Sequence, residues 1–262
     1  MAVQAQRISP PLDVPLPYAT WVEATIPQAR RLSEDELAAT VTEAYGAVRE
    51  QLSGLSIVRM WNYIPGITDP LGPGRDRYMA FNAGRYAAMS TWFGGPEQLL
   101  ANAPAASGVG ASGDDLIIHA LALPQPGVSV QNPWQTPAVD YSQKFGPRPP
   151  CFARATRVGD LLLVSGTAAI RGEESVAGDL AGQLRTTLEN LAVLPHGGLR
   201  AYRSLRVFLP DVTHRADVGA KLLAATARGC DMSFVHAALC RRELLVEIEG
   251  IANESRPHGG TI

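Results

Sequence analysis

Two acidic side chains stand close together in the apolar segment "CRRELLVEIEG", which spans residues 240–250. Glu247 and Glu249 alternate with apolar residues, and a period of two predicts a strand with both glutamates on one face. A carboxyl group held among apolar neighbours has a raised pKa and can deliver a proton as a general acid. A glutamate that faces solvent at a strand edge is the alternative, and the spacing alone leaves both open.

Four arginines near aromatic residues form the second candidate feature. Arg77 and Arg85 belong to one helix-like segment, whereas Arg148 and Arg154 flank "PPCFA", close to Tyr141. The guanidinium group binds carboxylates through two parallel hydrogen bonds. Four arginines around two loops therefore fit a small substrate with two negative charges. Ordinary ion pairs at the surface are the alternative interpretation of the same residues.

Other motifs argue against common cofactor and hydrolase chemistry. The segment "GVGASG" (108–113) has the spacing G-x-G-x-x-G, but a nucleotide-binding loop needs a strand before it and a helix after it. A strand follows here, so we expect a glycine loop that closes one side of a pocket. The five histidines have no metal-ligand spacing, and Ser165 in "VSGTA" lacks the acid and histidine order of a hydrolase triad.

The composition limits the class of protein. The chain has 262 residues and 46% hydrophobic content, enough for one large domain or two small ones. A net charge of −2 disfavours a nucleic-acid partner or a membrane surface, and no apolar run has the length of a membrane span. Three cysteines without C-x-x-C spacing indicate reduced thiols and a cytoplasmic location.

The elements that must position these residues follow from hydrophobic periodicity. In the first half, Ser33 and Glu36 form a capping-box pattern at the start of a helix over 34–53. The first 19 residues are Pro-rich and predict an extended arm, and the Pro-rich stretch 132–150 has a length that is often functional. The remaining predicted elements of this half are a strand over 55–65, a loop over 68–76, a helix over 77–93 and a strand over 114–123.

The second half gives clearer signals in the order β-α-β-α-β-β. The predicted elements are a strand over 159–170, a helix over 179–194, a strand over 204–211, a helix over 216–227 and strands over 233–240 and 243–252. Both halves mix strands and helices, so the sequence predicts an α+β fold. We expect one domain over 1–150 and a second over 151–262.

Several segments together resemble known families. "GDLLLVSGTAAI", "QLRTTLENLAVL", "RVFLPD" and "LLVEIEGIA" resemble the RidA-like (YjgF) fold, in which two helices cover one face of a mixed sheet. "RMWNYIPGI", "RYMAFNAGR", "PAASGVGASG", "FGPRPPCFARAT", "VSGTAAI" and "CRRELLVEIEG" resemble the chorismatases in the same order. That resemblance implies two related halves and release of pyruvate from chorismate, with either 3-hydroxybenzoate or a dihydroxycyclohexadiene carboxylate as the second product.

The resemblance also implies roles for particular residues. Glu247 matches the family's catalytic glutamate, which would protonate the enolpyruvyl methylene, while Glu249 would be a hydrogen-bonded or solvent-facing neighbour. Arg148 and Arg154, followed by Arg85, would bind the two carboxylates of chorismate. The implied reaction needs no metal and no organic cofactor. The other residues expected at the substrate are Tyr141, Ala155, Gly166 and Cys240.

Two aspects of the resemblance leave alternatives open. Cys240 resembles the 3-hydroxybenzoate branch of the family, whereas Ala155 resembles the hydrolytic branch. Chorismatases carry further strands before the helix that follows Ser33, and the short Pro-rich lead here implies a reduced N-terminal half. A divergent enzyme for another carboxylated ring, or a RidA-like small-molecule binder without catalysis, are the alternatives. RidA-like domains usually trimerise, so the resemblance implies either a homotrimer or two fused halves that partly replace separate subunits.

Overall fold

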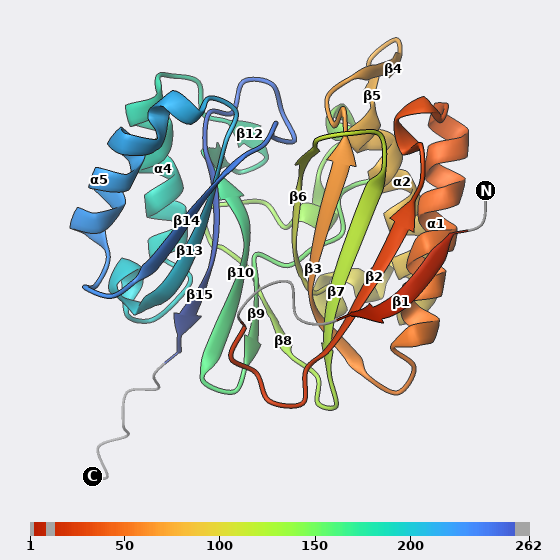
Figure 1. The fold of residues 1–262 in the computed structure, drawn as a ribbon, viewed down its shortest axis with the longest axis horizontal. Helices are drawn as coiled ribbons and strands as arrows, with labels where there is room; N and C mark the ends of the chain where they lie inside the picture. Colours follow the sequence, from red (N-terminus) through yellow and green to blue (C-terminus); the bar gives the residue numbers. More distant parts are fainter. Residues whose placement is uncertain (1–2, 9–13, 255–262) are drawn as a thin grey trace.

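The computed structural model describes residues 3–8 and 14–254 and shows two β-sheets with helices on the outer sides (Figure 1). The sheets lie side by side in the middle of the molecule, so each half has one helical face and one face toward the other half. This arrangement confirms the predicted α+β class. No helix in the described part of the chain is long and apolar enough to span a membrane.

The N-terminal half is a five-stranded sheet with the order β1-β2-β7-β3-β6. Two long helices, α1 (Glu34–Gln51) and α2 (Arg77–Phe93), cover one face of it. Its strands are β1 (Gln4–Ile8), β2 (Thr20–Ile26), β3 (Ser56–Pro65), β6 (Ala105–Ala111) and β7 (Leu116–Leu123). The smaller elements of this half are β4 (Pro70–Gly72), β5 (Arg75–Asp76) and α3 (Leu99–Asn102).

Local signals fix both long helices where the sequence predicts them. Ser33 caps α1, because its hydroxyl accepts from the Glu36 amide while the Glu36 carboxylate accepts from the Ser33 amide at 2.9 Å. This is the reciprocal capping box expected from the sequence. Asp76 caps α2 by accepting from the Met79 amide at 2.9 Å, and Gly94 ends that helix in the left-handed conformation.

The C-terminal half is a six-stranded sheet with the order β14-β13-β15-β10-β9-β8. Helices α4 (Leu180–Ala192) and α5 (Arg215–Ala225) cover its outer face (Figure 1). The strands are β8 (Val128–Val130), β9 (Ala155–Val158), β10 (Leu161–Ala168), β13 (Tyr202–Leu209), β14 (Asp231–His236) and β15 (Glu247–Asn253). A short hairpin of β11 (Ile170–Arg171) and β12 (Glu174–Ser175) follows β10.

The two halves repeat one topology. In the first, β2, α1, β3, α2, β6 and β7 follow one another, and the sheet order is β2-β7-β3-β6. In the second, β10, α4, β13, α5, β14 and β15 follow one another, and the sheet order is β10-β15-β13-β14. The pair β3–β6 is parallel, as is the corresponding pair β13–β14. The expectation of two related halves is therefore confirmed, and β15 is the counterpart of β7.

The structure differs from the sequence predictions at the N-terminus and between the halves. Strand β1 lies inside the expected extended arm and pairs with β2, so two strands precede the helix after Ser33. Residues 1–2 and 9–13 of that arm, and 255–262 at the other end, lie outside the described residues. Strand β8 pairs with β9 and so joins the C-terminal sheet, although the boundary at residue 150 stays a prediction.

Two further predictions are wrong in detail. The segment "GVGASG" is not a loop at its start, because β6 runs through Ala111 and pairs in parallel with β3. Its glycines permit close packing: a Cβ on Gly108 would lie 3.2 Å from the ring of Tyr78. The last strand begins at Glu247 instead of residue 243, since the amide of Leu245 donates to the Gln183 side chain at 2.9 Å.

The halves meet where β6 lies against β9 and β10. Side-chain hydroxyls of the C-terminal half accept from backbone amides of β6, with Thr156 bonded to Ala105 at 2.7 Å and Ser165 to Ala106 at 2.9 Å. In the opposite direction, the amide of Gly166 donates to the Ser107 hydroxyl at 2.8 Å. These bonds satisfy buried polar groups on both sides and fix the seam between the sheets.

Candidate active site

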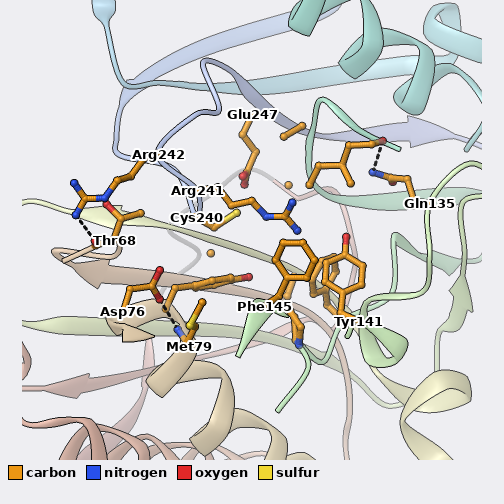
Figure 2. A pocket seen from close by; sticks show the side chains of 18 of the residues that line it. Thr68, Asp76, Met79, Gln135, Tyr141, Phe145, Cys240, Arg241, Arg242 and Glu247 are labelled. Carbon is orange, nitrogen blue, oxygen red and sulfur yellow. Dashed lines mark hydrogen bonds between the residues drawn. The ribbon is translucent and has the colours of Figure 1, made fainter. Parts of the chain in front are cut away.

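A cavity of about 330 Å³ opens at this seam, within the size range of small-molecule sites. Its wall combines apolar and aromatic side chains with a few charged ones from both halves. Figure 2 shows Glu247 and Arg241 reaching into the space on one side and Phe145 and Tyr141 on the other. The residues of its wall include Tyr78, Arg85, Gly108, Gln135, Tyr141, Phe145, Phe152, Arg154, Gly166, Cys240, Arg241 and Glu247.

Glu247 is a buried acid at the start of β15. It pairs with Ala168 of β10 on one side and with Phe208 of β13 on the other, and only 4% of its surface is exposed. Burial raises the pKa of its carboxyl to about 8, and the nearby charge of Glu249 acts in the same direction. The carboxyl therefore carries a proton over most of its population at pH 7 and can donate it inside the cavity.

Glu249 lies two residues further along the same strand. The carboxyl of Glu247 is protonated, whereas that of Glu249 is ionised. Arg59 donates to its carboxylate at 2.8 Å, Trp61 at 3.0 Å and Arg206 at 2.7 Å, and the Ser107 hydroxyl donates as well. Burial acts to raise its pKa, but Arg206 and Arg59 hold the pKa below its ordinary value. Glu249 is therefore a buried, fully hydrogen-bonded carboxylate, and it does not face solvent.

The two glutamates answer the question raised by their spacing. They share one strand and one face, but one side chain has apolar neighbours and the other has two arginines. Environments that push two pKa values apart are typical of sites in which one carboxyl is the acid and the other remains an anion. In this geometry Glu247 is the carboxyl that can donate a proton, and Glu249 is a fixed negative charge.

Two buried arginines in the cavity have no carboxylate partner among the residues that the structure describes. Arg85 donates to the Asn82 side chain at 2.7 Å, and Arg154 donates to the Tyr141 hydroxyl at 2.9 Å. The Nε atoms of both are buried without a partner in the described part of the chain. A buried cation is costly unless an anion neutralises it, so these donors are suited to an anionic ligand.

The sequence analysis missed two arginines that follow Cys240 directly. The guanidinium group of Arg241 lies 3.9 Å from the centre of the Phe145 ring and donates to Ser175 at 3.0 Å. Arg242 is exposed at the rim and donates to the Thr68 carbonyl at 2.5 Å. Both stand in the segment that carries Glu247, so basic residues next to the candidate acid were the available signal.

Most of the expected site residues come together, and two do not. Arg148 is exposed, and its guanidinium lies over the Tyr86 ring at 5.2 Å, outside the lining of the cavity. Ala155 is fully buried in the core of the C-terminal half and also lies outside the lining. The expected residues that do line the cavity are Arg85, Tyr141, Arg154, Gly166, Cys240 and Glu247.

The other candidate chemistry in the cavity is weak. Burial raises the pKa of the Cys240 thiol to about 12, with a further contribution from Glu247, so this side chain is uncharged at neutral pH. Within residues 3–8 and 14–254, no cluster of three or more His, Cys, Asp or Glu side chains is arranged to hold a metal ion. The site is therefore an acid and a set of cations in a largely apolar wall.

Gly166 has no side chain, and the Glu247 carboxyl occupies the space that a side chain at this position would fill. A Cβ at this position would collide with the Glu247 carboxyl, so Gly166→Ala should displace the proton donor. We expect kcat for the reaction proposed below to fall by about 100-fold, since a misplacement of roughly 1 Å has effects of that size. Pyruvate release measures it, with Gly46→Ala as the matched control, because a Cβ on this helical residue meets no atom within 4 Å. Wild-type kcat in Gly166→Ala would contradict the assigned position of the acid.

Known proteins are similar to this chain in sequence and in fold. The N-terminal domain of the FkbO/Hyg5-like chorismatases matches residues 19–122. A 3-hydroxybenzoate synthase of Streptomyces hygroscopicus is 33% identical over 86% of this chain and 71% of its own length. A chorismatase of Streptomyces rapamycinicus is 35% identical over 75% of this chain and 64% of its own length. A chorismatase crystal structure matches with a TM-score of 0.74 at 28% identity, over 90% of this chain and 77% of that one.

These similarities extend over both halves of the molecule. The chain spans about two thirds to three quarters of the length of the relatives and of the matched structure. Sequence identity above 30% over most of the chain agrees with the fold match. This protein therefore belongs to the chorismatase family.

Proposed function

We propose that this protein cleaves the enolpyruvyl ether of chorismate and releases pyruvate together with 3-hydroxybenzoate. The observation that carries the proposal is the buried carboxyl of Glu247, with a pKa of about 8, in one cavity with the buried arginines Arg85 and Arg154. Chorismate is a dianion with one carboxylate on its ring and one on its enolpyruvyl group. Relatives named 3-hydroxybenzoate synthase and chorismatase support this substrate.

The proposed first step is protonation of carbon. Arg85 and Arg154 bind the carboxylates and orient the enolpyruvyl methylene toward Glu247. Transfer of the Glu247 proton to that methylene converts the vinyl ether into an oxocarbenium ion. The carboxylate that remains on Glu247 faces the new positive charge and stabilises it. Protonation of carbon is the difficult part of this cleavage, and an acid with a raised pKa suits it.

The second step captures the cation and balances the reaction. The neighbouring ring hydroxyl adds to the oxocarbenium ion, gives its proton to Glu247 and forms a cyclic ketal. The bond from that oxygen to its ring carbon and the bond from the ketal carbon to the original ether oxygen then break. The carbon chain leaves as pyruvate, with the former hydroxyl oxygen as its keto oxygen. The ring becomes aromatic by losing the proton of the carbon that bears the remaining ether oxygen, and that oxygen takes up a proton to become the phenol hydroxyl. Chorismate then yields pyruvate and 3-hydroxybenzoate without net uptake of water. Capture by water instead would yield pyruvate and a dihydroxycyclohexadiene carboxylate.

The choice of product rests on the wall of the cavity. Cys240, which resembles the 3-hydroxybenzoate branch, lines the cavity, whereas Ala155, which resembles the hydrolytic branch, lies outside the lining. This placement supports 3-hydroxybenzoate as the product.

The three cysteines are free thiols, in keeping with a cytoplasmic protein, and the trimer stays a prediction.

The test is incubation of the purified protein with chorismate. Pyruvate is followed by a coupled lactate dehydrogenase assay, and the ring product is identified by chromatography. Pyruvate with 3-hydroxybenzoate is the expected result. Pyruvate with a non-aromatic diene would keep the cleavage but overturn the proposed product. No pyruvate above the background of the Glu247→Gln protein would reject chorismate cleavage.

The pH dependence of the reaction should report the acid. Burial first, and Glu249 second, raise the pKa of Glu247 to about 8, so its proton is present below that pH and lost above it. We expect kcat/KM to fall about tenfold per pH unit once the pH exceeds about 8. Initial rates of pyruvate release between about pH 6 and about pH 10 measure this limb. A rate that stays constant across the range would contradict Glu247 as the donor.

A further inference from the structure

We propose that Glu249 is a positioning residue of this reaction: the N-terminal half holds it as a permanent anion, and its charge keeps the proton on Glu247. The inference rests on the proposed function for its catalytic meaning. The electrostatic coupling between the two carboxyls follows from their positions in the structure. It can be measured as a shift in the titration of Glu247, without any turnover.

The clamp around Glu249 joins both halves of the molecule. Arg59 and Trp61 of β3 donate to it at 2.8 and 3.0 Å, and Ser107 of β6 donates as well. Arg206 of β13, which pairs with Glu249 across the sheet, contributes the second guanidinium. Burial lowers the pKa of Arg59 to about 10, which leaves this arginine charged at neutral pH. Glu249 is therefore a carboxylate with four donors, three of which come from the N-terminal half.

Ser107 connects this clamp to the acid. Its hydroxyl donates to Glu249 and accepts from the amide of Gly166 at 2.8 Å. The same hydroxyl oxygen lies 3.1 Å from the point that a Cβ on Gly166 would occupy, and the Glu247 carboxyl lies against that point as well. The two carboxyls are thus separated only by a serine hydroxyl and a glycine backbone. Their positions on one strand face are about 7 Å apart, close enough for strong coupling in a buried site.

Other charged groups also face Glu247 from the elements around it. Burial is the largest cause of the raised pKa of Glu247, the charge of Glu249 adds to it, and Arg59 acts in the opposite direction. Burial raises the pKa of the Tyr78 hydroxyl and of the Cys240 thiol, and both are uncharged at neutral pH. The remaining titratable groups of the cavity wall are Asp76, Arg85, Tyr141, Lys144, Arg154, Arg241, Arg242 and Glu243. Most of these are cations, so Glu249 is the buried anion that opposes them.

The substitution Glu249→Gln removes the negative charge of this side chain but keeps its shape, so it distinguishes the effect of the charge on Glu247 from the effect of packing. Glutamine has nearly the same size and still accepts hydrogen bonds, but it leaves Arg59 and Arg206 without their counter-charge. The proton on Glu247 should then be lost at lower pH, by about one pH unit or more. Glu249→Asp keeps the charge and should stay within about half a unit of the wild type. Arg206→Gln removes a cation from the clamp and should not move the Glu247 titration downward.

The first measurement is NMR titration of proteins labelled with ¹³C at the glutamate carboxyl. The resonance that titrates highest and disappears in Glu247→Gln reports this acid, and it should move down in Glu249→Gln. Glu254→Gln is the matched control, because Glu254 is a buried, ion-paired glutamate just past the same strand, bound by Arg157 at 2.9 Å. That control should leave the resonance in place. An unchanged Glu247 titration in Glu249→Gln, or a downward shift in Arg206→Gln, would overturn the proposal.

Kinetics then connect the coupling to the reaction. In Glu249→Gln the alkaline limb of kcat/KM should shift to lower pH by the same amount, with activity recovered at acidic pH and in Glu249→Asp. A purely structural role would lower the rate at every pH alike and would overturn the proposal. Absence of turnover in the wild type would reject chorismate cleavage but leave the NMR result to decide the coupling, so the two failures are distinguishable.

Discussion

Replacement of Glu247 by glutamine is expected to abolish pyruvate release from chorismate, with kcat lowered by about 10³-fold or more. Glutamine has the shape of glutamate but no proton of useful acidity, so the vinyl ether is no longer protonated. The arginines of the cavity are unchanged, and substrate binding should persist. A fall in kcat with little change in affinity is typical of a group that acts in the transition state. Stopped or coupled pyruvate assays, together with calorimetric titration of chorismate, measure the two quantities.

The control for this substitution is Glu254→Gln. It also removes a buried carboxylate near the end of β15, but Glu254 contacts Arg157 and His196 and does not line the cavity. Its kcat should remain within about threefold of the wild type, the range of ordinary substitutions away from a site. If Glu247→Gln retained turnover, another group would be the donor. If the wild type bound chorismate without turnover, the protein would be a binder.

Replacement of Arg85 by methionine is expected to lower kcat/KM by about 10²- to 10³-fold while leaving the ligand-free protein as stable as before or more stable. The guanidinium is 1% exposed and has no carboxylate partner in the described part of the chain. Loss of one member of a buried charge pair weakens binding strongly. Without the ligand, however, the same group is an uncompensated buried charge, and an apolar side chain of similar length removes that penalty.

Kinetic measurements test the expected loss of kcat/KM, and thermal unfolding tests the expected stability of the ligand-free protein. Arg148→Met is the matched control, because Arg148 is exposed, lies over the Tyr86 ring and is outside the cavity lining. It should change kcat/KM by less than about threefold. A large loss of Tm in Arg85→Met, with unchanged kcat/KM, would show that this arginine is structural. An equal loss of kcat/KM in both variants would contradict the assignment of Arg85 and Arg154 to the ligand.

The local parts of the fold follow from the sequence because their causes are local. The helix after Ser33 begins at its own capping box, and the helix over 77–93 has the bounds that its periodicity predicts. The last strand differs, because alternation continues back to residue 243 whereas the ladder begins at Glu247. The amide of Leu245 bonds to the Gln183 side chain, which is distant in the sequence, and no local pattern reports that partner.

The predicted site residues that line the cavity differ from those that do not in the direction of their side chains. Arg148 and Arg154 have similar surroundings in the sequence, with aromatic residues and prolines nearby. In the structure Arg154 is buried in the cavity wall, whereas Arg148 is exposed over Tyr86. Spacing reports the type of a residue and its neighbours along the chain, but a long irregular connection has no period from which the direction of a side chain follows.

The sequence by itself predicted the α+β class, because hydrophobic periodicity and capping act over a few residues, whereas the two related halves and the role of Glu247 were implied by its resemblance to a known family. It placed Glu247 and Glu249 on one strand face. Only the tertiary structure decided that one of them is protonated and the other ionised. That difference comes from Arg206, which is 43 positions from Glu249, from Arg59, which is 190 positions away, and from Ser107, which is 142 positions away. Charge state depends on burial and on partners brought together by folding, and neither is a property of sequence spacing.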